Sequence, residues 1–130
     1  MTTQRRVVHE ASRRRRLPAM ESVRVLVEPD DDPDTSFLDQ EEFDDRREAY
    51  QRGAFTFVGI RAEAEIVVDG IVQHITSGGL WGVESDAGNP YICEVANEEY
   101  NDLRRILKTL GVPTSELPME VDPKWIVWRM

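Results

Sequence analysis

The chain has 130 residues, of which 32% are charged and 40% hydrophobic, and its formal net charge is −9. This length is typical of one domain with one core. The single cysteine, Cys93, excludes an internal disulfide and a paired-cysteine metal or redox motif. No apolar run approaches the roughly 18 residues of a membrane span, and none follows the N-terminal arginines as in a signal peptide. We therefore expect one soluble cytoplasmic domain without a cofactor.

The N-terminal segment is strongly basic. Residues 1–20 contain six arginines and one glutamate, without a periodic apolar pattern. This composition predicts a disordered arm. Arginine clusters bind phosphates without reading bases, so the alternative hypothesis is a nucleic-acid-associated protein that uses this arm. The residues of that alternative are Arg13, Arg14, Arg15 and Arg16.

Residues 21–130 predict a single α+β domain. Val23, Val25 and Val27 alternate with other residues, which predicts a strand that Pro29 ends. Residues 28–52 predict an acidic loop followed by a short surface helix from about Asp39 to Arg52, closed by Gly53.

The centre of the chain, residues 54–84, predicts a β-hairpin core. Residues 55–68 alternate and are rich in β-branched and aromatic types, which is typical of a half-buried strand. Asp69-Gly70 favours a tight turn, after which residues 71–76 return as the partner strand. Residues 80–84 predict a further short strand.

The C-terminal part predicts a helix over 97–110. Asn97 is a candidate N-cap, Gly111 follows the predicted end, and an apolar stripe runs along one side. Residues 114–130 predict a linker and an apolar tail, in which Trp125 and Trp128 form either a final strand packed on the core or a docking motif. The expected architecture is a three- to four-stranded antiparallel sheet with one C-terminal amphipathic helix packed on it and a peripheral acidic helix.

Two patterns offer weak chemistry. Asp30, Asp32, Asp34 and Glu41 have the spacing of a calcium loop, but Thr35 occupies the position that requires glycine. His74, Ser77 and Asp86 contain the residue types of a hydrolase triad but lack the turn that presents a nucleophile. We therefore rank a calcium-binding module and a small hydrolase third, after the hypotheses of a protein-binding accessory protein and of a nucleic-acid-associated protein.

The acidic stretch is the main candidate for partner binding. Residues 28–48 contain eleven carboxylates and two arginines. Carboxylates spaced along a loop and helix can imitate DNA phosphates and occupy the basic cleft of a nucleic-acid-handling enzyme, or they can form an ordinary solvated face. Trp81, flanked by glycines, is either a binding residue or a core anchor. The predicted partner-binding residues are Asp30, Asp31, Asp32, Asp34, Asp39, Glu41, Glu42, Asp44, Asp45 and Trp81.

Two motifs in the central region carry a resemblance. The segment AEAEIVV over 62–68 and the segment QHITSGGLWGVESD over 73–86 resemble small uncharacterised proteins encoded by bacteriophages, plasmids and actinobacterial genomes. The resemblance covers residues 50–111 and implies a genomic setting in a bacterial host rather than an activity. We therefore expect a non-enzymatic accessory protein that binds another protein, in its sharpest form an acidic DNA mimic that inhibits a nucleic-acid-handling or defence enzyme.

Overall fold

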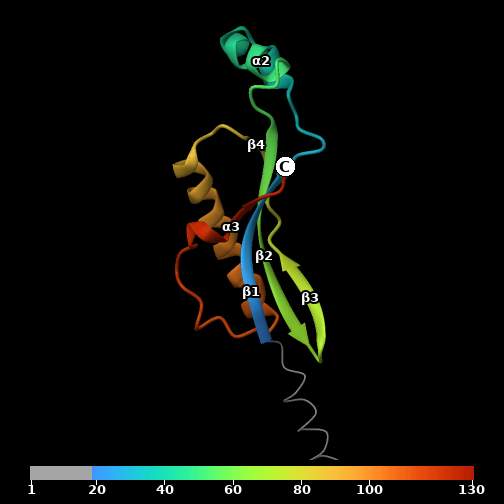
Figure 1. Ribbon diagram of the computed structural model, residues 1–130, viewed down its shortest axis with the longest axis vertical. Coiled ribbons are helices and arrows are strands. Elements are labelled where there is room, and N and C mark those ends of the chain that lie inside the picture. Colours follow the sequence, from blue (N-terminus) through green and yellow to red (C-terminus); the bar gives the residue numbers. More distant parts are fainter. Residues whose placement is uncertain (1–18) are drawn as a thin grey trace, which may run out of the picture.

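The computed structural model describes residues 19–130, which form an α+β domain (Figure 1). The strands are β1 (Ala19–Pro29), β2 (Phe57–Val68), β3 (Ile71–Thr76), β4 (Leu80–Glu84) and β5 (Ile126–Trp128). The α-helices are α2 (Asp44–Gln51) and α3 (Asn89–Thr109), and short 3-10 turns lie at η1 (Ser36–Asp39), η2 (Glu41–Phe43) and η3 (Pro123–Trp125). The α+β class, the packed C-terminal helix and the peripheral acidic helix are confirmed.

The sheet has five strands rather than the expected three or four. Its order is β3-β2-β1-β5, and β4 pairs with β2. β1 and β2 are antiparallel along their whole length, and β3 and β4 follow one another along the other side of β2. β5 is parallel to β1, so the prediction of a purely antiparallel sheet is wrong at this edge. The C-terminal tail supplies β5, which agrees with the hypothesis that Trp125 and Trp128 belong to a final strand.

The turn between β2 and β3 has the predicted conformation. Asp69 and Gly70 both have positive φ, 52° and 78°. Two such residues in succession form the turn whose twist matches a tight hairpin. The turn therefore fixes the register of the β2–β3 pair, from Val68 opposite Ile71 to Glu63 opposite Thr76.

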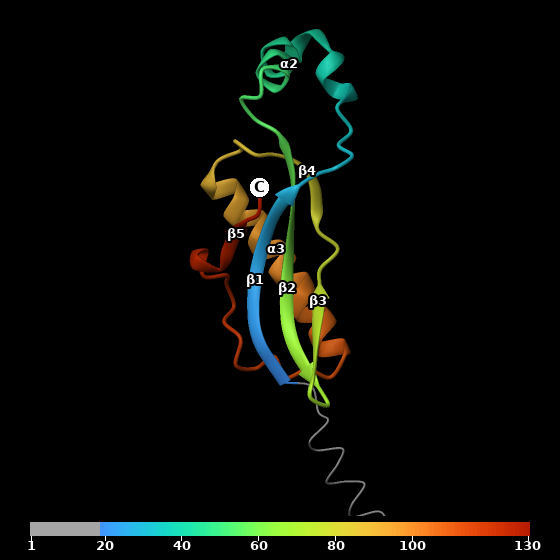
Figure 2. The same ribbon diagram turned by 45° about the vertical axis from the view of Figure 1, so that its right-hand side comes forward.

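Helix α3 covers one face of the sheet (Figure 2). Its buried residues include Ile92, Val95, Tyr100, Leu103 and Leu107, which pack on the alternating apolar side chains of β1 and β2. The helix begins at Asn89 instead of the predicted residue 97, with Pro90 in its first turn. Asn97 is not an N-cap: it lies inside the helix, where its Oδ1 accepts a hydrogen bond from the Val121 backbone N–H at 2.8 Å.

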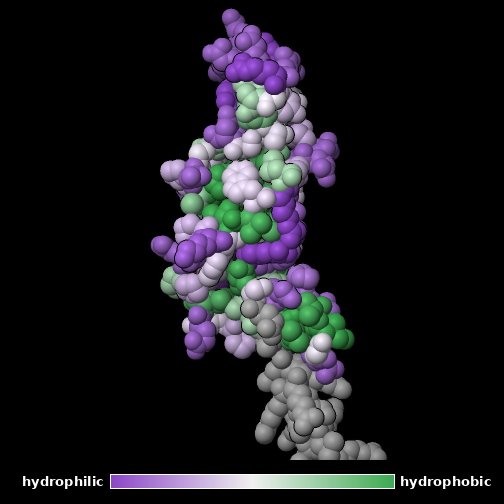
Figure 3. Space-filling view, in the orientation of Figure 1, coloured by the Kyte–Doolittle hydropathy of each residue, from purple (hydrophilic) through white to green (hydrophobic). Residues whose placement is uncertain are grey.

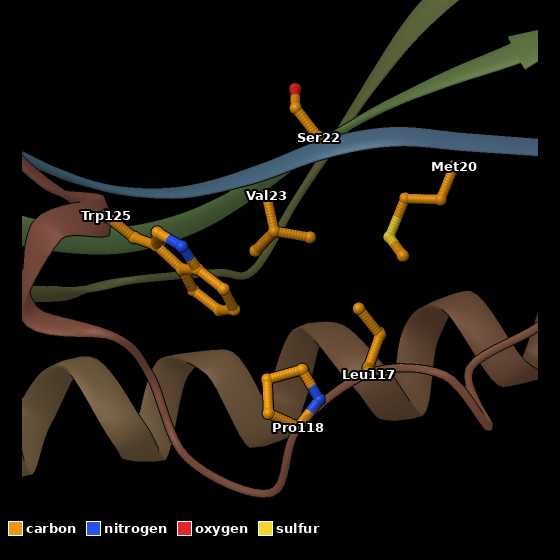
Figure 4. A pocket seen from close by; sticks show the side chains of 6 residues that line it. All are labelled: Met20, Ser22, Val23, Leu117, Pro118 and Trp125. Carbon is orange, nitrogen blue, oxygen red and sulfur yellow. The ribbon is translucent and has the colours of Figure 1, made fainter.

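The tail packs where the sheet meets the helix. Trp125 contacts Tyr100 edge-on at 5.8 Å between ring centroids, and the Tyr100 hydroxyl donates to the Pro118 carbonyl at 2.7 Å. Figure 4 shows Met20 and Val23 pointing toward Leu117. Both side chains face this way because a bulge interrupts the register of β1 between Met20 and Ser22. Together with the tail these side chains line an apolar hollow of about 310 Å³.

Candidate functional site

The acidic stretch folds as a separate lobe, residues 30–56, inserted between β1 and β2. Figure 1 places α2 beyond one end of the sheet. The lobe has an apolar cluster in which Leu38, Ala49 and Phe55 are buried together with Phe57, the first residue of β2. Phe37, Phe43 and Tyr50 pack around them, with ring centroids 5.2 to 6.1 Å apart among the aromatic members. This cluster holds in one shape the backbone that carries the carboxylates.

Arg46 attaches the lobe to the domain. Its guanidinium lies 4.0 Å from the centre of the Phe55 ring and bonds Glu84 at 2.8 Å and Asp86 at 2.7 Å. The hydrogen bond from Arg46 lowers the pKa of Asp86, and the pKa of Arg46 is raised chiefly by the same bond. One arginine therefore anchors α2 to the loop that follows β4.

The predicted partner-binding carboxylates divide into two groups. Asp30 is structural, because Oδ2 accepts from the Gly82 N–H at 2.9 Å and Oδ1 from the Asp32 N–H at 3.1 Å. Asp34 bonds Ser36, which lowers its pKa, and Asp44 pairs with Arg47 at 2.7 Å. The other six are exposed and form no ion pair within residues 19–130: Asp31, Asp32, Asp39, Glu41, Glu42 and Asp45. Figure 3 shows this end of the molecule as strongly hydrophilic.

An open groove lies where the lobe meets β4 and the start of α3. We call it the aromatic groove; it has a volume of about 500 Å³, and its principal lining residues are Phe37, Leu80, Trp81, Val83 and Tyr91. Leu80, Trp81 and Tyr91 are exposed by 39%, 46% and 43%. Because Asp30 bonds Gly82, the acidic loop is fixed next to β4, and the one carboxylate among residues 19–130 that lines the groove is Glu84, which bonds Arg46. The structure therefore brings Trp81 and the acidic stretch together, as one surface.

Trp81 lies flat on the backbone of β2. A Cβ built on Gly59 would be 2.0 Å from Cε3 of Trp81, so only glycine permits this contact. The indole N–H donates to the Gly78 carbonyl at 3.3 Å. The ring is thus half covered by backbone and half exposed, which makes Trp81 both an anchor and a surface residue. Sequence reasoning missed Gly59, although a glycine inside a β-branched strand signals a close approach.

A buried carboxylate holds the connection between β3 and β4. Glu99 of α3 is 7% exposed, and its Oε1 accepts from the Ser77 hydroxyl and from the Gly79 N–H, both at 2.8 Å. The Ser77 oxygen also accepts from the Ala62 N–H at 2.9 Å. Glu99 therefore fixes the glycine turn that carries Trp81.

The weak chemical candidates are not assembled. Ser77 is bound to Glu99 and Asp86 to Arg46, while His74 is exposed on β3 opposite Glu65. No group of three or more histidines, cysteines or carboxylates within residues 19–130 is placed to hold a metal. The structure thus does not bring Asp30, Asp32, Asp34 and Glu41 together as calcium ligands. Arg13 to Arg16 lie outside the described residues.

The sheet face opposite α3 is largely self-neutralised. Arg24 bonds Glu63 at 2.7 Å, and Arg61 bonds Glu28 at 2.5 Å. The hydrogen bond from Arg61 lowers the pKa of Glu28. Because these four charges pair with one another across the strands, this face offers less net charge to a ligand than the lobe does.

The C-terminal tryptophans have different surroundings. Trp125 is half-buried against Tyr100, whereas Trp128, the last residue of β5, is 43% exposed. Cys93 is free and half-buried on α3, as expected for a structural cysteine. The tail is therefore a strand, and a docking role concerns only Trp128.

Comparisons with protein-family models, with curated proteins and with solved structures find no match to the chain. No helix within residues 19–130 has the length and apolar character needed to cross a membrane.

Proposed function

We propose that the protein is a non-enzymatic binding protein whose aromatic groove and acidic lobe together hold a basic, aromatic-containing segment of a protein partner. The observation that carries this proposal is the position of three half-exposed apolar side chains, Leu80, Trp81 and Tyr91, in a groove that the acidic lobe joins through Phe37 and through the hydrogen bond between Asp30 and Gly82. Buried aromatic anchors supply most of the free energy of an interface, while surrounding charges steer the partner and select it.

The sharper form of the proposal is an acidic DNA mimic that inhibits a nucleic-acid-handling or defence enzyme. Six exposed carboxylates lie on a lobe that projects from the end of the sheet (Figure 1), where a basic cleft can reach them. A cleft built for DNA attracts such an array as it attracts phosphates, so DNA and the lobe compete for it. This form of the proposal names a host or viral enzyme as the partner.

The test compares capture of partners from a nuclease-treated bacterial lysate by four immobilised forms. These are the natural chain, a lobe variant, Tyr91→Ala, and Leu110→Ala as a control at an exposed site on the other end of α3. The lobe variant replaces six carboxylates by amides: Asp31→Asn, Asp32→Asn, Asp39→Asn, Glu41→Gln, Glu42→Gln and Asp45→Asn. We expect one protein to be captured by the natural chain and the control, and to be lost from the other two.

Added double-stranded DNA separates the two forms of the proposal. Release of the captured protein by DNA supports the mimic, while retention supports a partner without a DNA-binding cleft. Capture that is equal for all four forms contradicts both. The runner-up, nucleic-acid association through Arg13 to Arg16, predicts salt-sensitive retention of DNA by the natural chain and loss of that retention on deleting residues 1–19.

A further inference from the structure

The outer edge of β3 is a strand edge without a partner in the described part of the chain. β3 stands at one end of the strand order, and its only neighbour among residues 19–130 is β2. A strand edge presents backbone donors and acceptors that can pair with another strand. None of the β3 residues lines the aromatic groove, and the inference does not depend on the function proposed above.

The backbone groups that face outward follow from the hydrogen bonds to β2. The Ser77 N–H donates to the Ala62 carbonyl at 2.9 Å, so Ser77 faces β2. In an antiparallel pair residues alternate between facing the neighbour and facing away. The register from Ser77 to Ile71 has no irregularity, so the outward residues are Val72, His74 and Thr76.

Nothing in the strand itself protects this edge. Natural edge strands carry charges, prolines or bulges that prevent pairing with other molecules. β3 reads Ile-Val-Gln-His-Ile-Thr, without lysine, arginine, a carboxylate or proline, and without a bulge. Ile71 and Val72 are 60% and 49% exposed, and Figure 3 shows a hydrophobic patch over this end of the hairpin.

We propose that a second copy of the chain occupies this edge, with β3 pairing antiparallel to β3 of the partner about a two-fold axis. The axis passes at His74, so that Val72 of each copy pairs with Thr76 of the other. In this register all three outward residues of each copy pair with outward residues of the other, whereas a register centred on Gln73 pairs only two of them. A two-fold interface requires a self-complementary surface, and an antiparallel strand edge satisfies that requirement.

Charge favours the same arrangement. The chain carries a net charge of −9, and the acidic lobe repels a second lobe. Figures 1 and 2 place the lobe at the end of the molecule opposite the β2–β3 turn. Antiparallel pairing of the two β3 strands therefore directs the lobes away from each other, while the uncharged edges meet.

The test measures molar mass by sedimentation over a range of concentrations for the natural chain, Val72→Lys and Leu110→Lys. Both variants replace an exposed apolar residue by the same charge, but only the first lies on the β3 edge. We expect the natural chain and Leu110→Lys to reach twice the monomer mass together. Val72→Lys needs at least about tenfold higher concentration, because in both copies a charged lysine replaces the apolar residue that pairs with Thr76 of the other copy.

Amide hydrogen exchange of the natural chain gives a second readout that needs no variant. The Val72, His74 and Thr76 amides exchange more slowly as concentration rises, while amides on the exposed face of α2 do not change. A natural chain that is monomeric at every concentration overturns the proposal and leaves the edge to a different partner. A dimer that Val72→Lys does not weaken, or His74 exchange independent of concentration, overturns it as well.

Discussion

The contact between Gly59 and Trp81 predicts a strong coupling between two residues that are distant in sequence. A Cβ at residue 59 would lie 2.0 Å from the indole, so Gly59→Ala must displace Trp81 from β2. Trp81 is 46% exposed, and an indole side chain buries up to about 250 Å². The contact therefore covers roughly 130 Å², equivalent to about 3 kcal/mol at the usual coefficient. Because a displaced ring keeps some contacts, we expect Gly59→Ala to lower the free energy of unfolding by about 2 kcal/mol.

A double-mutant cycle measures this coupling by urea unfolding followed with far-ultraviolet circular dichroism. In a Trp81→Ala background the same Gly59→Ala change meets no ring, so it should raise the free energy of unfolding by up to about 1 kcal/mol, as alanine does inside a strand. The control is Gly78→Ala, since a Cβ at Gly78 has no atom within 4 Å. Equal costs for Gly59→Ala in the two backgrounds would refute the reasoning.

Three further predictions concern the lobe, the buried carboxylate and the tail. Arg46→Met should speed amide exchange in α2 while leaving β2 unchanged. In the natural chain the lowered pKa of Asp86 stabilises the fold at pH values above the ordinary pKa of 3.8, and this stabilisation is lost as the pH falls through the lowered pKa. Arg46→Met removes the cause of the lowered pKa, so amide protection of the lobe should depend less on pH below about pH 4. Ser77→Ala should lower the free energy of unfolding by about 2–4 kcal/mol in urea, because it removes a buried hydrogen-bond donor to the Glu99 carboxylate of α3. A decrease of less than about 1 kcal/mol would contradict this reasoning. Trp125→Ala should lower the free energy of unfolding by about 2–3 kcal/mol, and Trp128→Ala should lower it by less than about 1 kcal/mol, as measured by thermal unfolding. Equal losses would mean that the edge-on contact between Trp125 and Tyr100 contributes nothing.

Local signals in the sequence were sufficient for much of the sheet and for the end of the acidic helix, although that helix begins at Asp44 and not at about Asp39, because 3-10 turns occupy residues 36–43. Asp69-Gly70 specifies its turn through backbone conformation alone, and the alternation in residues 57–68 shows which side chains face α3. Gly53, with φ of 78°, ends the acidic helix as expected. Each of these features depends on neighbours within a few residues, so the sequence pattern was enough.

The start of α3 shows where a local signal misled. Asn97 followed by two glutamates is typical of a helix N-terminus, yet Pro90 in the first turn marks the actual one. Ile92 and Val95 continue the apolar stripe of the later part of the helix, and this periodicity was available in the sequence. The Asn97 side chain instead bonds the tail, a partner that no local pattern indicates.

The aromatic groove required the fold. Phe37, Trp81 and Tyr91 come from the lobe, from β4 and from α3, and only tertiary packing brings them to one place. The parallel pairing of β5 with β1 has the same cause, because the two strands are about 100 residues apart in sequence. Composition identified the acidic stretch and Trp81 separately, but their common surface depends on the bond between Asp30 and Gly82.

The lobe is an insertion in what is otherwise a continuous hairpin. β1 and β2 pair as far as Pro29 and Val58, and the Asp30 N–H donates to the Phe57 carbonyl at 3.0 Å, so the two ends of the insertion are already adjacent. A short turn could join these ends without altering the strand order. The strand order of the platform therefore does not depend on the lobe, and a segment of another sequence can join the same two strand ends while the pairing of β1 with β2 stays the same.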